Sequence, residues 1–156
     1  IKSAVGITPV TADGFPADEQ TRKFLWELIH QEDMTGQGVA AMTGQRLSAQ
    51  WSRVVAQYNL ATSDANAMRG YYKMWIDTDF SGEAASVRPK TPIRIIGGRQ
   101  DLPGFSEQKY RETFGAWYPN ADLQFITDAG HFPMYETPVY LATLIESHLN
   151  AHRTPK

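Results

Sequence analysis

The pattern of apolar and polar positions in the second half of the chain alternates between two periods. Apolar runs from Pro92 to Gly97 and from Asp122 to Thr127 predict two buried strands. Between them, aromatic residues at helical spacing predict a helix from Ser106 to Trp117, and a last helix begins near Thr137. Strands and helices that alternate over short connections are typical of a parallel sheet covered by helices.

The first half of the chain has one predicted strand and a long helical region. The segment from Ala4 to Val10, which contains β-branched residues, predicts a strand, and Asp18 is a candidate helix N-cap. An apolar helical stripe follows Asp18 and fades before Gly36, and further helical patterns run from Gly44 to Trp75. The small, polar and charged residues from Phe80 to Lys90 predict a connecting loop.

The helical region interrupts the alternation of strands and helices. We therefore expect an α/β fold with a three-stranded parallel sheet, whose core is formed by residues 1–16 and 91–156. Residues 17–90 are expected to form a helical cap, or lid, that is inserted above this sheet rather than a second independent domain.

Composition limits the kinds of site and partner that the chain can have. With 156 residues, of which 42% are hydrophobic, the chain is long enough for one globular core. A net charge of −2 without a basic stripe argues against nucleic acid, and no apolar stretch is long enough to span a membrane. The chain has no cysteine, and no grouping of His, Asp and Glu has metal-ligand spacing. We therefore expect no metal site, no nucleic acid partner and no membrane partner.

The chain begins with Ile1, inside what resembles the start of a strand. Because this residue is not methionine, we expect that a preceding segment has been removed. A signal peptide can be lost in the same way, so the sequence does not fix the compartment. The absence of cysteine is compatible with both cytosol and periplasm, and a soluble, cytoplasmic protein is slightly favoured.

Two residues of catalytic type follow two of the predicted strands. Asp101 comes after the apolar run that ends at Gly98, and His131 lies thirty residues later, in the turn after the next strand. Since strand, helix and strand fill that interval, both loops are expected at the carboxyl edge of the sheet, where reactive groups of such folds gather. An acid that orients an imidazole, and an imidazole that deprotonates a nucleophile, are two members of a catalytic triad. The spacing therefore suggests two thirds of a triad.

Three segments resemble the α/β-hydrolase fold. The run from Thr91 to Asp101 (TPIRIIGGRQD) is similar to the strand of that fold that ends in glycine and is followed by the acid. The run from Asp128 to Pro138 (DAGHFPMYETP) resembles its histidine loop, and Ile7 to Pro16 resembles its sixth strand and the entrance to the cap. The resemblance implies that His131 is the general base, that Asp101 holds its tautomer, and that no cofactor is required.

The nucleophile of that fold has no match in this sequence. The family places it on a sharp turn such as G-x-S-x-G, upstream of the sixth strand. The serines lack these flanking glycines; they are Ser3, Ser48, Ser52, Ser63, Ser81, Ser86, Ser106 and Ser147. We therefore expect the chain to be a C-terminal segment, inactive alone, whose partner is an N-terminal half of the same hydrolase that carries the nucleophile. The free edge of the strand from Ala4 to Val10 would pair with that half.

Further candidate residues come from the turns and the cap. Asp13 is an alternative acid, because some relatives place the acid after the sixth strand. The cap aromatics stand at helical spacing, so they form the core of the cap or face a pocket. The residues expected to contact substrate are Trp51, Tyr58, Tyr71, Tyr72, Trp75 and Phe132. The remaining histidines, expected to be surface or packing residues, are His30, His148 and His152.

The leading hypothesis is a serine hydrolase that acts on small, largely apolar esters, lactones or related acyl compounds. An aspartate nucleophile, as in epoxide hydrolases and haloalkane dehalogenases, would use the same His131 and stays open. A pair of cap tyrosines would indicate an epoxide hydrolase, but Tyr71 and Tyr72 are adjacent and point in different directions on a helix. A third hypothesis is a fragment or degenerate homologue that acts as a binding module without catalysis.

Overall fold

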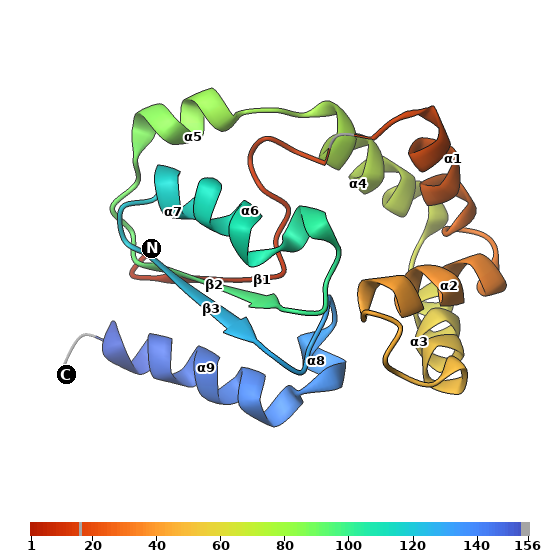
Figure 1. Cartoon of the computed structure of the whole chain (residues 1–156). Helices are drawn as coiled ribbons and strands as arrows, with labels where there is room; N and C mark the ends of the chain where they lie inside the picture. The colour runs from red at the N-terminus through yellow and green to blue at the C-terminus, as the bar shows by residue number, and fades with distance from the viewer. Residues whose placement is uncertain (16, 154–156) are drawn as a thin grey trace.

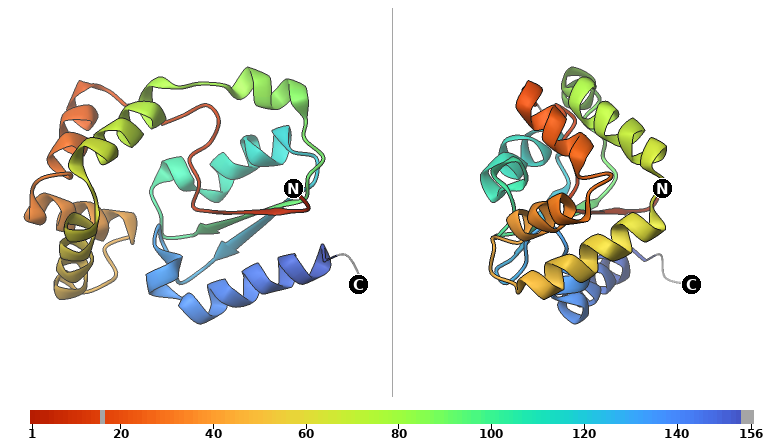
Figure 2. Two further views of the ribbon diagram at one scale, coloured as in Figure 1. Left: turned by 180° about the vertical axis from the view of Figure 1, so that it is seen from behind. Right: turned by 90° about the vertical axis from the view of Figure 1, so that its right-hand side faces the viewer.

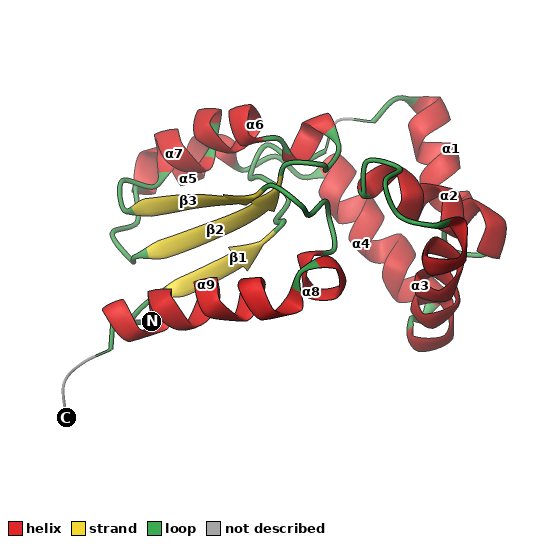
Figure 3. Cartoon of the chain, turned by 60° about the horizontal axis from the view of Figure 1, so that its bottom comes forward, coloured by secondary structure: helices red, strands yellow, loops and turns green. Residues whose placement is uncertain are grey.

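Three parallel strands form the centre of the computed structural model, which describes residues 1–15 and 17–153 (Figure 1). They are β1 (Ala4–Ile7), β2 (Ile93–Gly98) and β3 (Ala121–Ile126), in the order β1-β2-β3. The predicted three-stranded parallel sheet is therefore confirmed, and Figure 3 shows the strands side by side. Pro16 and residues 154–156, which belong to the predicted core segments, lie outside the described residues.

Helices cover both faces of the sheet. The helices α6 (Glu107–Glu112) and α7 (Phe114–Trp117) lie on one face, and α9 (Pro138–Ala151) lies on the other (Figure 1). Ile95 and Ile96 are neighbours in β2, so their side chains point to opposite faces. Each is almost fully buried, and each belongs to a different core cluster. The sheet is thus sandwiched between two apolar layers, as the alternating pattern predicts.

The segment between β1 and β2 is helical. It contains α1 (Glu19–Glu27), α2 (Glu32–Met42), α3 (Ala49–Thr62), α4 (Ala65–Asp77) and α5 (Ser81–Val87). The first four lie beyond the carboxyl ends of the strands, whereas α5 returns to lie near α7 beside the sheet (Figures 1 and 2). Asp18 caps α1 as predicted, because its carboxylate accepts a hydrogen bond from the Thr21 amide at 2.8 Å.

Three of the predictions about the helices are wrong. The glycines near Gly36 do not end the helical region, because α2 runs through them. At Gly38 a Cβ atom would stand 2.9 Å from Leu28, so the glycine lets that leucine approach the helix. The predicted loop from Phe80 to Lys90 contains α5, and the predicted helix from Ser106 to Trp117 is interrupted at Thr113. Thr113 has a φ of −110° and a ψ of −83°, which is not helical and separates α6 from α7.

Other short elements frame the loops at the strand ends. A 3₁₀ turn, η1 (Pro103–Phe105), follows β2, and α8 (Pro133–Glu136) precedes α9. β1 ends at Ile7, earlier than predicted, because Thr8 adopts a positive φ of 42° that a strand cannot accommodate. Within the described part of the chain, no helix combines the length and apolarity needed to cross a membrane.

His148 is a buried histidine on the side of α9 that faces the sheet. It is 2% exposed, and no described residue makes a hydrogen bond with its Nε2 atom. Burial lowers the pKa of His148, and the positive charges of His152 and Arg94 lower it further. The Asp122 carboxylate and a backbone hydrogen bond with Ala4 oppose this shift. The folded chain therefore holds this imidazole neutral at a pH where the unfolded chain would protonate it.

We expect the free energy of unfolding to decrease as the pH falls below about 6.5, the ordinary pKa of histidine. Because the folded state has the lower pKa, the unfolded state binds the proton first and is favoured by acid. The pKa values of Asp13 and Asp122 are lowered from 3.8, so these residues affect stability only at more acidic pH. Urea unfolding at pH 7.5 and 5.5 measures the effect.

His148→Leu should reduce the difference in stability between these two pH values. The matched control is His30→Leu, since His30 is exposed at the end of the α1 region. If His148→Leu keeps the full decrease seen in the unchanged chain, His148 is not its source.

Candidate active site

The structure brings His131 and Asp101 into direct contact at the carboxyl edge of the sheet. Asp101 lies three residues after the end of β2, and His131 lies five residues after the end of β3. The Nδ1 atom of His131 is 2.8 Å from the Oδ2 atom of Asp101. The Asp101 side chain is fully buried, and its other oxygen accepts the Leu102 amide at 2.7 Å. The carboxylate is therefore fixed in one orientation.

This contact determines which nitrogen of the imidazole is free. A carboxylate only accepts hydrogen bonds, so the proton of the neutral ring lies on Nδ1 and Nε2 has the free lone pair. No described residue makes a hydrogen bond with Nε2. The ring is held between Phe105 and Phe132, whose centroids lie 4.6 Å and 5.3 Å from it. His131 thus presents a basic nitrogen on a ring whose rotation is limited by its neighbours.

The Glu136 carboxylate holds the backbone on both sides of His131. It accepts hydrogen bonds from the Gly130 amide at 2.9 and 3.0 Å and from the Phe132 amide at 2.9 Å. The Glu136 side chain is fully buried and forms an ion pair with Arg46, in the loop between α2 and α3. Arg46 also donates to the Asp128 carbonyl at 2.7 Å. The histidine loop is therefore held from the core and from the helical insertion together.

Thr8 supports the same loop from β1. Its hydroxyl donates to the His131 carbonyl at 3.1 Å, and its amide donates to the Ile96 carbonyl at 2.8 Å. A positive φ is unusual for a β-branched residue and costs about 1–3 kcal/mol. The strained backbone turns Thr8 so that it bridges β2 and the histidine loop.

Two glycines allow the loops after β2 and β3 to close on each other. A Cβ atom on Gly98 would stand 2.1 Å from the Gly130 carbonyl oxygen and 2.3 Å from that of Ala129. A Cβ atom on Gly130 would stand 2.3 Å from the Met42 carbonyl oxygen. Since these neighbours are backbone atoms, they cannot move aside cheaply. Glycine is required at both positions for Asp101 and His131 to meet.

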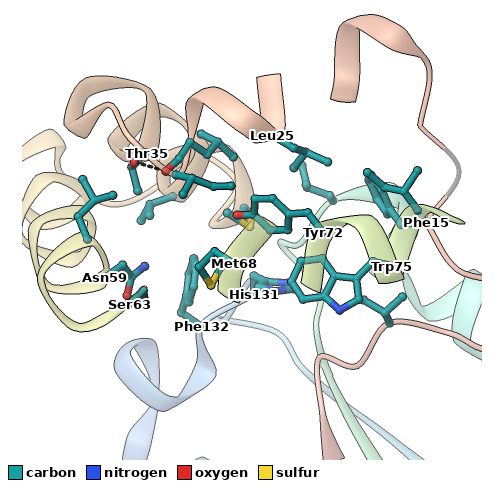
Figure 4. Close-up of a pocket in the computed structure, with 18 of the residues that line it drawn as sticks. Phe15, Leu25, Thr35, Asn59, Ser63, Met68, Tyr72, Trp75, His131 and Phe132 are labelled. Carbon is teal, nitrogen blue, oxygen red and sulfur yellow. Dashed lines mark hydrogen bonds between the residues drawn. The ribbon is translucent and has the colours of Figure 1, made fainter. Parts of the chain in front are cut away.

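A cavity of about 310 Å³ opens beside His131, beneath the helices α1 to α4. Its lining is mostly apolar, and Figure 4 shows Met68 and Tyr72 near His131, with Asn59 and Ser63 at one end. The Tyr72 hydroxyl has no hydrogen-bond partner among the described residues, and burial raises the pKa of this side chain. It therefore stays protonated and can donate a hydrogen bond to a ligand.

A second cavity, of about 430 Å³, lies on the side of β1. It is lined by residues that follow this strand, including Thr8 and Pro9, and by Met74, Trp75 and His131. His131 therefore lies between two open spaces. One is under the helical insertion, and the other is beside the end of the sheet's first strand.

The aromatic residues predicted to contact substrate divide into two groups. Tyr72, Trp75 and Phe132 line the first cavity. Trp51, Tyr58 and Tyr71 are not among the described residues that line it, and the two tyrosines are more than half exposed. The buried residues of α3 are Ser52, Val55 and Ala56, and neither Trp51 nor Tyr58 is among them.

Asp13, the alternative acid, pairs with other residues. Its carboxylate accepts hydrogen bonds from Lys109 and Thr11, and none joins it to His131. Burial alone would raise the pKa of Asp13, but the hydrogen bonds from Lys109 and Thr11 outweigh it and lower the pKa. The geometry therefore favours Asp101 as the partner of the imidazole. In residues 1–15 and 17–153, no cluster of three His, Asp or Glu side chains could hold a metal ion.

Several residues of the site could not be identified from the sequence. Phe15, Leu25, Asn59 and Met68 line the cavity, but their contacts come from elements that are distant in sequence. Glu136 alone carried a local signal, because an acid placed shortly after a Gly-His turn can accept the amides of that turn.

Solved structures with a similar fold include esterases and other hydrolases. An esterase from Exiguobacterium antarcticum matches with a TM-score of 0.70 and 10% identity, over 94% of this chain and 57% of the esterase. A hydrolase from Oleispira antarctica matches with 0.69 and 17%, over 96% and 57%. An enzyme described as degrading N-acyl homoserine lactone matches with 0.61 and 16%, over 92% and 56%. No protein-family model and no curated protein matches the sequence.

These matches decide the fold class. The chain has part of the α/β-hydrolase fold. It spans little more than half the length of the solved structures described above. The predicted resemblance of the three segments to the α/β-hydrolase fold is confirmed. The structural neighbours also include a phospholipase and a bromoperoxidase, so the α/β-hydrolase fold alone does not name one reaction.

We expect Gly98→Ala to destabilise the chain by about 1–3 kcal/mol or more, because the new methyl group would overlap two carbonyl oxygens. Gly70→Ala is the matched control. Gly70 lies in α4 with open space around its Cα, so alanine should stabilise that helix by about 0.5–1 kcal/mol. Urea unfolding of both variants checks the pair. Equal stability of the two variants would contradict the required closure of the loops.

Proposed function

We propose that this chain is the C-terminal segment of a serine hydrolase of the α/β-hydrolase type, and that His131 and Asp101 are its base and acid. The observation that carries the proposal is the orientation of one ring. Nδ1 of His131 is bonded to a buried carboxylate, and no described residue occupies Nε2, while His131 lines two cavities. A general base needs this arrangement, because one nitrogen is oriented while the other takes the proton.

In the complete enzyme, a serine on the N-terminal half attacks the carbonyl carbon of an ester. Nε2 of His131 takes the hydroxyl proton as the bond forms, and the Asp101 carboxylate stabilises the resulting imidazolium. The imidazolium then gives that proton to the departing alcohol, which leaves an acyl-enzyme. Water next attacks the acyl group and gives its proton to Nε2, and the serine recovers a proton from His131 as the acid is released.

Two features support a nucleophile on a separate segment. Within the described residues, β1 pairs only with β2, so its other edge is free to receive a further parallel strand. The second cavity lies beside the residues that follow β1 and reaches His131. A nucleophile at the end of a strand next to β1 would enter the site through this space.

The lining of the first cavity supports small, largely apolar acyl compounds as substrates. Leu60, Met68 and Trp75 supply apolar surface for an acyl chain, and the Tyr72 hydroxyl can donate to an acceptor on it. The structural neighbours include esterases and an enzyme that degrades N-acyl homoserine lactone, which agrees with esters or lactones. Tyr72 lines the cavity and Tyr71 does not, which favours an ester or lactone substrate over an epoxide.

His131→Ala should reduce kcat by roughly 10⁴-fold, because the serine would lose its base. The protein to use is the longer product translated from the gene region that precedes Ile1 together with this chain, and the assay is hydrolysis of p-nitrophenyl butyrate. Asp101→Asn should cause a loss of the same order, since the amide would favour the wrong tautomer.

His30→Ala is the control and should leave the rate unchanged. Near-normal activity of His131→Ala would overturn the proposal. A preceding region that encodes no nucleophile elbow would overturn it as well.

Met68→Trp should shorten the acyl chain that the longer product accepts. Met68 lies near Tyr72 and His131 in the cavity, so a larger side chain would fill the space beyond the carbonyl carbon (Figure 4). We expect kcat/KM for p-nitrophenyl octanoate to fall roughly 10- to 100-fold, with little change for the acetate ester. Val54→Trp, at an exposed position of α3, serves as the control. Equal losses for both esters would argue against acyl binding in this cavity.

A further inference from the structure

We propose that Arg46 is a positioning residue for His131, and that it acts through the buried carboxylate of Glu136. Arg46 lies in the loop between α2 and α3, and His131 lies in the loop between β3 and α8. The helical insertion would then set the geometry of the imidazole as well as cover the cavity. The kinetic consequence rests on the proposed function, whereas the structural consequence can be measured on this chain alone.

Glu136 is the link between the two loops. Its carboxylate accepts the amides of Gly130 and Phe132, the residues on either side of His131. Its side chain has no exposed surface. A buried carboxylate is stable only when its charge is compensated, so its ability to hold the two amides depends on its counter-ion.

Arg46 supplies that counter-ion from outside the core. Its Nη2 atom forms the ion pair with Glu136 and also donates to the Asp128 carbonyl at 2.7 Å. In the described part of the chain, no other cationic side chain pairs with Glu136. Arg46 therefore touches both ends of the turn that contains His131, at Asp128 and at Glu136, without touching the imidazole.

The backbone before Arg46 is shaped to present it. After α2, Gly44 has a φ of 64° and Gln45 a φ of 53°, so the chain reverses sharply. The Gln45 amide donates to the Ala40 carbonyl at 2.8 Å, which closes the end of α2. A left-handed glutamine is costly, and the structure holds it where the next residue reaches the histidine loop.

A second contact joins the same two loops. The His131 amide donates to the Met42 carbonyl at 2.9 Å. Met42 is the last residue of α2, so the backbone of His131 is bonded directly to the insertion. Removing Arg46 leaves this bond and the Thr8 hydroxyl to hold the turn, while the buried charge of Glu136 is uncompensated. We therefore expect the turn to shift, and the imidazole to leave its optimal position on Asp101.

The test measures the Nδ1 proton of His131 by NMR in this chain. A proton shared between an imidazole and a carboxylate resonates far downfield, and Asp101→Asn identifies the signal by removing it. We expect Arg46→Met, which keeps the aliphatic stem, to abolish or broaden this resonance, and Arg46→Lys to retain it. Arg22→Met is the matched control, since it removes another arginine ion pair of the insertion, with Asp77 at 2.8 Å. An unchanged resonance in folded Arg46→Met would overturn the proposal.

A double variant keeps the test decisive if Arg46→Met does not fold. Arg46→Met with Glu136→Gln removes both charges and keeps one carbonyl acceptor for the loop amides. Recovery of the fold, with a weaker or shifted Nδ1 resonance, would support the linkage through Glu136. Recovery of the fold with a fully normal resonance would show that the ion pair does not position His131.

Kinetics of the longer product then separate this inference from the proposed function. Arg46→Met should lower kcat roughly 10²-fold with little change in KM for a short ester, and Arg46→Lys should restore most of it. If His131→Ala stays active while the resonance of Arg46→Met is lost, the proposed function fails and the positioning role stands. If the resonance and kcat of Arg46→Met are both normal, the positioning role fails and the proposed function stands.

Discussion

The hydrogen bond between His131 and Asp101 is the interaction on which the site depends. It joins two loops that lie thirty residues apart in sequence, and it forms only because β2 and β3 are adjacent and parallel. The loops meet because the carbonyls of Ala129 and Gly130 pack directly on Gly98, with no room for a side chain. Backbone packing at the sheet edge therefore comes first, and the buried carboxylate then fixes the imidazole.

The sheet and its edge could be predicted because their signals are local. Apolar runs define β2 and β3, and the interval between Asp101 and His131 holds one crossover unit. The insertion was harder to predict, because small residues give weak periodicity. The helix α5 has only Ala84 as a buried residue, and α2 contains Gly36 and Gly38, which propensity alone places at a helix end. Tertiary packing decides these elements.

The meeting of Asp101 and His131 was predictable, but the residues that hold them in place were not. Arg46 and Glu136 are ninety positions apart, and Thr8 reaches a carbonyl that lies 123 positions away. No periodicity or spacing in a single sequence connects such positions. The same limit applies to Tyr72 and Tyr71, where a rotation of one residue on α4 decides which ring enters the cavity. The sequence identifies the residue types that suit catalysis. Contacts between positions that are distant in sequence determine how these residues are held in place.

Besides the Arg46–Glu136 ion pair, backbone hydrogen bonds attach the insertion to the core, which limits how it can move. At the entrance and exit, the Phe15 amide donates to the Trp75 carbonyl at 2.7 Å, and the Phe80 amide donates to the Ala12 carbonyl at 2.9 Å. Gly14 makes this crossing possible, because a Cβ atom there would stand 2.7 Å from the Trp75 carbonyl oxygen. The end of α2 makes a further attachment, through the amide of His131 itself. If α1 to α4 swung away as one rigid body, that bond would break. A ligand that entered by local movement within the helices, or from the side of β1, would leave that bond intact.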